Sequence, residues 1–186
     1  MNYHDYIWDL GGTLLDNYNM STQAFVQTLA FFNLPSDHDA VYQKLKESTA
    51  IAVASFAPEQ PQFLQKYQQN EAAKLAHPIW CLGTKEILTK IVASGSRNFL
   101  VSHRDQQVNQ LLSRAGLLSY FTEVVTASNG FARKPSPESL LYLKEKYDIS
   151  SGLVIGDRDL DKQAGQAAGF DTLLVDGRKN LLEIVT

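Results

Sequence analysis

Five short apolar runs, continuous rather than alternating with polar residues, constrain the fold of this chain more than any other feature. They span residues 4–9 (HDYIWD), 98–102 (NFLVS), 123–128 (EVVTAS), 152–157 (GLVIGD) and 171–177 (DTLLVDG). Continuous apolar runs are typical of strands that are buried on both faces, as in a parallel sheet. Stretches with helical patterning separate them and are long enough for crossover connections. One has a clear predicted start, with Ser136 as N-cap and Pro137 in the first turn.

Residues 17–78 interrupt this alternation of strand and helix. We find no convincing strand there, and three stretches have apolar residues near helical spacing: Tyr18–Phe32, Asp39–Val53 and Gln62–Leu75. The sequence therefore predicts an α/β protein whose core is a doubly wound, Rossmann-like parallel sheet. The core domain is formed by residues 1–16 and 79–186, and a small α-helical domain is inserted at 17–78.

Composition excludes several classes of function. The formal net charge is −3, so the chain lacks the basic surface that binding to nucleic acid requires. No apolar run approaches the roughly 20 residues that span a bilayer, and the first ten residues have no basic segment followed by an apolar core. We therefore expect a soluble, cytoplasmic protein with no membrane or nucleic-acid partner. Cys81 is the only cysteine and cannot form an internal disulfide.

Polar side chains stand where the predicted strands end. Asp9 ends the first run, Ser102 ends the second, Lys134 follows the third, and Asp157 and Asp161 follow the fourth. Ligands of open parallel sheets bind at the carboxyl ends of the strands, where the strand order reverses. The carboxylates would repel one another unless a cation lay among them. The hydroxyl and the ammonium group suit an anion with several oxygens, such as phosphate.

Each of these residues also has a plainer interpretation. The aspartates and Ser102 are residue types that cap helices and turns, and Lys134 could be a surface charge. Their combination at successive strand ends favours a ligand site, while the interpretation of the acids as caps alone stays open.

The strand-end motifs resemble those of a known family. DLGGTLLD (residues 9–16) is similar to the first motif of the haloacid dehalogenase superfamily, usually DxDGT. VSH (101–103), RKPSPE (133–138) and GDRDLD (156–161) resemble its second, third and fourth motifs. The inserted helical domain resembles the cap of the first subfamily, which includes enzymes like phosphoglycolate phosphatase. The resemblance covers nearly the whole chain.

This resemblance implies catalytic and metal-binding roles. Asp9 would be the nucleophile that forms an aspartyl-phosphate, with Lys134 as the second catalytic residue. Mg²⁺ would be held by Asp9, by Asp157 and by the main-chain carbonyl of Gly11, with assistance from Asp161.

The resemblance also implies a set of substrate-binding residues. They are Gly12, Thr13, Ser102, His103 and Lys134. The function that follows is an Mg²⁺-dependent phosphohydrolase acting on a small phosphorylated metabolite, as a monomer or a homodimer.

Gly11 departs from the family pattern. Phosphatases of the family have a second aspartate there, which protonates the leaving oxygen and then activates water. Asp9 is not that second aspartate, because Thr13 follows it by four residues, the spacing of the first one. Glycine keeps the main-chain carbonyl but removes an acid/base that is typically worth about 10²- to 10⁴-fold in rate.

Three alternatives follow from Gly11. The protein could be a catalytically weak or inactive relative of the phosphatases that binds a phosphorylated ligand or acts as a regulatory protein. It could be a phosphonatase-like hydrolase, which would use a cap lysine as a Schiff base; the candidates are Lys44, Lys46, Lys66 and Lys74. Alternatively, water, His103 or a residue of the cap could replace the missing acid.

Overall fold

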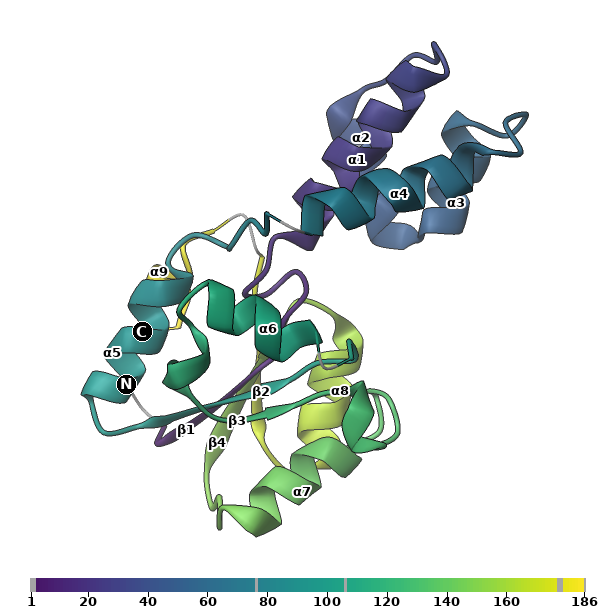
Figure 1. Cartoon of the computed structure of the whole chain (residues 1–186). Helices are drawn as coiled ribbons and strands as arrows, with labels where there is room; N and C mark the ends of the chain where they lie inside the picture. The colour runs from purple at the N-terminus through teal and green to yellow at the C-terminus, as the bar shows by residue number, and fades with distance from the viewer. Residues whose placement is uncertain (1–2, 76, 106, 177–178, 186) are drawn as a thin grey trace. The chain divides into compact units, whose positions relative to one another are not determined.

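The computed structural model describes residues 3–75, 77–105, 107–176 and 179–185, and it divides into two compact units (Figure 1). The core unit consists of Met1–Leu15 and Trp80–Thr186, and the helical unit consists of Asp16–Ile79. Within the described ranges, no helix has the length and apolar character that crossing a membrane would require.

The core unit contains a five-stranded sheet in the order β3-β2-β1-β4-β5, with every pair parallel. The strands are β1 (Asp5–Trp8), β2 (Arg97–Val101), β3 (Phe121–Val125), β4 (Gly152–Gly156) and β5 (Asp171–Leu174). The chain proceeds from β1 outward to β3 and then returns to the other side of β1. This reversal is the mark of a doubly wound fold and confirms the predicted fold class.

Helices cover both faces of the sheet (Figure 1). On one face lie α5 (Thr84–Ala93), α6 (Gln107–Arg114) and α9 (Leu181–Ile184), and on the other lie α7 (Glu138–Lys146) and α8 (Asp159–Ala167). Ile7, Phe99 and Val154 from the strands pack with Leu143 of α7 and Ala164 of α8 in one buried cluster. Because both faces are covered, β1 and β4 are buried along their whole length, as their continuous apolar sequences predict.

The helical unit contains α1 (Asn17–Phe31), α2 (His38–Glu47), α3 (Thr49–Phe56) and α4 (Phe63–Leu75). Its core is aromatic: the ring of Phe25 lies 4.8 Å from that of Phe63, 5.2 Å from that of Tyr67 and 6.1 Å from that of Phe56, between ring centroids. Aromatic pairs at these distances add to the stabilisation from buried area.

Two predicted helix boundaries are wrong. The helix predicted over Asp39–Val53 is two helices, because Ser48 has extended backbone and its hydroxyl accepts the amide of Ile51, which starts α3. The predicted N-cap at Ser136 is also wrong, because Pro137 occupies that position and α7 begins at Glu138.

Four of the five strands are shorter than the apolar runs that predicted them, and β2 has the same length as its run but begins one residue earlier. The run at 123–128 leaves the sheet after Val125, and the 3₁₀ turn η2 (Ala127–Asn129) follows. A second 3₁₀ turn, η1 (Leu118–Tyr120), precedes β3. The fifth run ends as a strand at Leu174, and its residue 177 lies outside the described residues.

Candidate active site

Two neighbouring strands, β1 and β4, flank the point where the strand order reverses, and acidic residues follow both. The amide of Asp9 donates to the carbonyl of Ile155 at 2.8 Å, which ties the first residue beyond β1 to β4. Asp157 is the first residue beyond β4, and Asp161 lies in the first turn of α8. The topology therefore brings all three aspartates to the edge where ligands bind in doubly wound folds.

The loop after Asp9 is folded tightly. The carbonyl of Leu10 accepts the amides of Leu14 and Leu15 at 3.0 and 2.8 Å, and the amide of Gly12 donates to the carbonyl of Leu15 at 2.8 Å. Gly12 has φ +82°, a conformation that favours glycine. Gly11 is not among the residues with positive φ, so its backbone does not require glycine.

Thr13 and Ser102 bring hydroxyls to this region. Thr13 is fully buried, and within the described residues its hydroxyl has no hydrogen-bond partner. A buried hydroxyl without a partner costs about 1–3 kcal/mol unless a ligand or water bonds to it. Ser102 is buried and accepts the amide of Arg104 at 3.2 Å, so it caps the loop as its plainer interpretation predicts.

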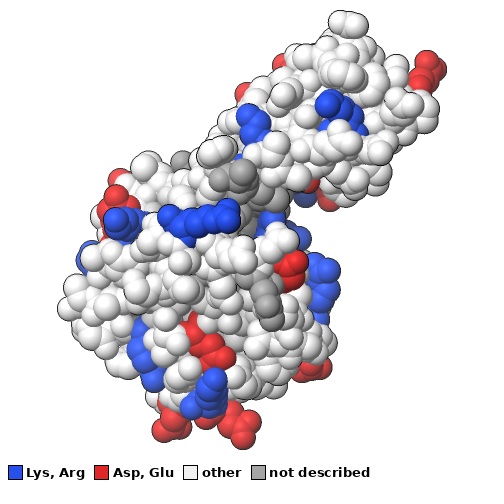
Figure 2. All heavy atoms as spheres, in the orientation of Figure 1, with Lys and Arg blue, Asp and Glu red and all other residues white. Residues whose placement is uncertain are grey.

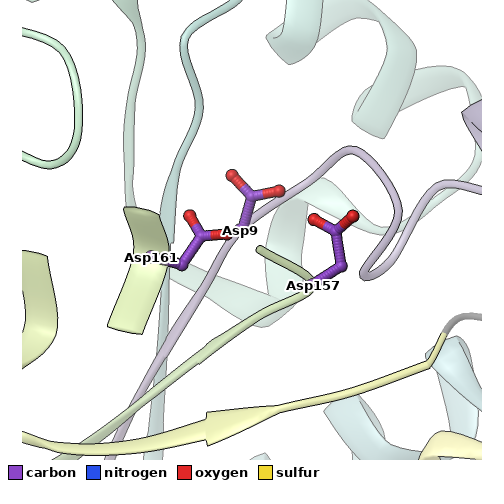
Figure 3. A group of neighbouring side chains, drawn as sticks. All are labelled: Asp9, Asp157 and Asp161. Carbon is purple, nitrogen blue, oxygen red and sulfur yellow. The ribbon is translucent and has the colours of Figure 1, made fainter. Parts of the chain in front are cut away.

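The three aspartates form one group. Asp9, Asp157 and Asp161 each offer a carboxylate oxygen within 4.8 Å of the others, and Figure 3 shows their carboxyl groups side by side. Asp9 and Asp161 are buried, and Asp157 is partly exposed. Hard carboxylate oxygens of this kind are the ligands that Mg²⁺ prefers, so the residues present fit a divalent cation.

Lys134 joins the group as a buried ammonium. Its Nζ donates to Oδ1 of Asp9 and to Oδ1 of Asp161, both at 2.5 Å, and its side chain is 3% exposed. Burial raises the pKa of Asp9, and the charge of Lys134 opposes that rise. Burial lowers the pKa of Lys134, but Asp9 and Asp161 outweigh this effect and hold the pKa above its ordinary value. Lys134 is therefore a permanent cation here.

Asp161 combines a capping role with an electrostatic one. Its Oδ2 accepts the amide of Arg158 at 3.1 Å at the start of α8, while its Oδ1 accepts from Lys134. Gly156 makes room for this side chain, because a Cβ there would collide with the Cβ and carboxyl group of Asp161. The interpretation of Asp161 as a cap is thus right in part. Sequence reasoning missed the role of Gly156, whose signal was its place directly before Asp157 in GDRDLD.

His103 contacts the main chain of Lys134. Its Nε2 accepts the amide of Lys134 at 3.0 Å, which places the ring proton on Nδ1. Burial, together with the charges of Lys134 and Arg133, lowers the pKa of His103 to about 4. The imidazole is therefore neutral near pH 7 and positions Lys134. This geometry gives no support to His103 as the replacement for the missing acid.

The four lysines of the predicted phosphonatase alternative are all engaged within the helical unit. Lys44 pairs with Glu47 at 2.8 Å, and Lys74 donates to Oε1 of Gln23 at 3.3 Å. The ammonium groups of Lys46 and Lys66 lie over aromatic rings. None is distinguished as a Schiff-base lysine.

Comparison with known proteins agrees with this geometry. The sequence profile of the haloacid dehalogenase-like hydrolases matches residues 6–175. The chain belongs to that family. Because the match spans both units, the resemblance inferred from four short motifs is confirmed for nearly the whole chain.

Individual relatives share the architecture. The crystal structure of a hydrolase from Streptococcus pneumoniae TIGR4 is 58% identical, with a TM-score of 0.92, and covers 98% of this chain and 96% of that one. The fructose-1-phosphate phosphatase YqaB of Escherichia coli K12 is 26% identical over 92% of this chain and 95% of its own length. A phosphoglycolate phosphatase of Nitrosospira multiformis is 36% identical over 50% of this chain and 42% of its own.

Proposed function

We propose that this hydrolase is an Mg²⁺-dependent phosphatase of small phosphorylated metabolites. The observation that carries the proposal is the buried cluster at the ends of β1 and β4, where Lys134 bonds to Asp9 and two further aspartates lie alongside. The names of the curated relatives, a fructose-1-phosphate phosphatase and phosphoglycolate phosphatases, support the same class of reaction.

In the proposed reaction, a carboxylate oxygen of Asp9 attacks phosphorus. A P–O bond to Asp9 forms while the ester P–O bond breaks, and the bonding pair leaves with the alcohol oxygen. Water then attacks the aspartyl-phosphate, which releases inorganic phosphate and restores Asp9. Lys134 and the hydroxyls of Ser102 and Thr13 bind the phosphoryl oxygens, and Gly12 lets the main chain approach them.

In this proposal Mg²⁺ would be held by Asp9, Asp157 and the main-chain carbonyl of Gly11. Asp161 would assist these ligands, and its Oδ1 also holds Lys134 in place. When bound, Mg²⁺ would supply positive charge that offsets the charge on the phosphoryl oxygens.

Gly11 restricts the substrates that would react well. Without an acid beside the leaving oxygen, an alkoxide leaves poorly, and the missing group is typically worth about 10²- to 10⁴-fold in rate. Aryl, acyl and anhydride phosphates have leaving groups that depart without a proton. We therefore propose that such substrates react faster than alkyl phosphates.

The test is hydrolysis of 4-nitrophenyl phosphate with Mg²⁺, comparing the wild-type protein with Asp9→Asn. We expect Asp9→Asn to abolish turnover and to remove a hydroxylamine-sensitive phosphoryl label from the protein. Asp39→Asn is the matched control, because the Asp39 side chain is 91% exposed on α2. Equal rates for the wild type and Asp9→Asn would exclude Asp9 as the nucleophile.

Gly11 also favours a second candidate, a protein that binds a phosphorylated ligand with little turnover. In that case release of the leaving group from a good aryl or acyl phosphate would stop near one equivalent per protein, because the phosphoryl group would stay on Asp9. Repeated Asp9-dependent turnover would exclude this candidate.

A further inference from the structure

A groove on the helical unit has no part in the proposed reaction. It runs between α3 and α4 and has a volume of about 660 Å³, which is within the usual range of small-molecule sites. Its lining belongs entirely to the helical unit, and more than half of it is apolar. The lining residues are Thr49, Ala50, Val53, Ala54, Pro58, Leu64, Tyr67, Gln68 and Glu71.

Among the described residues that line the groove, only Glu71 is charged. Its carboxylate is partly buried, and its Oε1 accepts the hydroxyl of Ser21 on α1 at 2.5 Å and the hydroxyl of Tyr67 at 2.8 Å. Burial, together with the charge of Glu71, raises the pKa of Tyr67, so the phenol stays protonated and donates at neutral pH. Two hydroxyls from two helices therefore hold the carboxylate in place at the groove.

The carboxylate of Glu71 lacks a cationic partner. In the ranges that the structure describes, no basic side chain lies within ion-pair distance of it, and no hydrogen bond reaches its Oε2. The two lysines of α4 are engaged elsewhere, since the ammonium group of Lys66 lies over the ring of Phe31 and Lys74 donates to Gln23. A partly buried carboxylate without a counter-charge, beside apolar surface, suits a cation that carries its own apolar part.

The groove is long enough for a short alkyl chain. Leu64 and Glu71 lie seven positions apart on α4, which corresponds to about 10 Å along the helix axis. We infer that the helical unit has a binding site for a small organic cation, a primary ammonium ion on an apolar chain. The ammonium group bonds to Glu71, and the chain lies between Val53 and Leu64. This site does not depend on the proposed phosphatase function.

The experiment compares n-hexylamine with 1-hexanol, which have the same chain and differ in charge, because an alkylamine is protonated at pH 7. NMR titrations of the full isotope-labelled chain measure both Kd values. We expect the amine to bind about tenfold more tightly, because hydrogen bonds to charged groups are stronger than neutral ones. Added salt should reduce this preference. The amide signals that shift should be those of the groove.

Three variants separate the charge from the cavity. Glu71→Gln keeps an acceptor for Ser21 and Tyr67 and should remove the preference for the amine. Glu47→Gln is the matched control on α2, where Glu47 pairs with Lys44, and should keep it. Ala54→Trp places a large ring in the groove at an exposed position and should weaken the binding of both probes. Circular dichroism checks that each variant is folded.

Several outcomes would overturn the inference. These are equal Kd values for the two probes, a preference that Glu71→Gln keeps, and binding that Ala54→Trp does not weaken. If the signals of the groove shifted with protein concentration alone, the occupant would be a second copy of the chain, and the inference would also be wrong.

Discussion

The two units of this protein bury different kinds of side chain. The core unit buries Lys134 between Asp9 and Asp161, whereas the helical unit buries Phe25 among other aromatic rings. Burying apolar rings stabilises a fold by itself, but burying charges carries a desolvation penalty that ion pairing only partly offsets. The aromatic cluster is therefore explained by folding alone, whereas the charged cluster is the candidate for a functional site. On the face seen in Figure 2, exposed acidic and basic residues are interspersed, so the buried cluster stands out by its location rather than by surface charge.

The largest effect should come from restoring the missing acid beside the charged cluster. We expect Gly11→Asp to raise kcat for an alkyl phosphate by about 10²- to 10⁴-fold, because an acid would then protonate the leaving alkoxide. The gain should be smaller for 4-nitrophenyl phosphate, whose leaving group departs unprotonated. The φ of residue 11 is not positive, so an aspartate there would not be forced into a left-handed backbone conformation.

The control for this variant is the double change Gly11→Asp with Asp9→Asn, which should be inactive. A lower kcat in Gly11→Asp would show that the site is adapted to glycine. That result would contradict the interpretation of this site as a phosphatase site that lacks only the acid at position 11.

Changes in the aromatic cluster around Phe25 should alter the stability of the helical unit. We expect Phe25→Ala to lower the free energy of unfolding of the helical unit by about 3–5 kcal/mol, because it leaves a cavity in a fully buried site. Urea unfolding checks this, with circular dichroism reporting the helices and the fluorescence of Trp8 and Trp80 reporting the core unit. Phe31→Ala is the control, since Phe31 is 62% exposed and should change stability by at most about 0.5 kcal/mol. An equal shift in both signals would show that the units unfold together.

A divalent cation should stabilise the core unit, which contains the charged cluster, and not the helical unit. We expect Mg²⁺ at about one hundred times its Kd to add about 2.7 kcal/mol to the stability of the core unit. Asp157→Asn should lose most of this gain, while Asp39→Asn should keep it. Thermal unfolding with and without Mg²⁺ measures the difference. If Mg²⁺ did not stabilise the wild-type protein, the three aspartates would be interpreted as capping residues and not as metal ligands.

The sequence predicted the sheet and the charged cluster well because both depend on local patterns. The continuous apolar runs of β1 and β4 lie where both faces of the strand are covered, whereas the edge strands β3 and β5 are only partly buried, so the prediction of burial on both faces is wrong for them. A parallel topology carries every strand end to the same edge. Asp9, Asp157 and Asp161 could therefore be placed together before any coordinates were known.

Features that depend on tertiary contacts could not be predicted in the same way. The break at Ser48 lies inside a pattern with continuous helical spacing, and only the extended backbone of that serine reveals it. Nothing in the sequence shows that Nε2 of His103 accepts the amide of Lys134, because 31 positions separate the two residues. A side chain such as that of His103 could act as an acid or as a hydrogen-bonding group that positions a neighbour. Only the hydrogen bonds that it makes in the folded protein distinguish these roles.

The smallest effect we expect is a pH dependence of stability from His103. Burial and nearby cations lower its pKa to about 4 in the folded protein, whereas the unfolded value is about 6.5. Its contribution is therefore fully present above pH 6.5 and is lost as the pH falls towards 4, because protonation sets a donor against the Lys134 amide. His103→Gln has an amide oxygen that can accept the same bond without titrating, so its stability should fall less between pH 7 and pH 4.5.

His38→Gln, on the exposed start of α2, should follow the wild type in the same urea titrations. If His103→Gln lost stability with acid as steeply as the wild type, the acid sensitivity would belong to the carboxylates, and the histidine would have no part in holding the charged cluster.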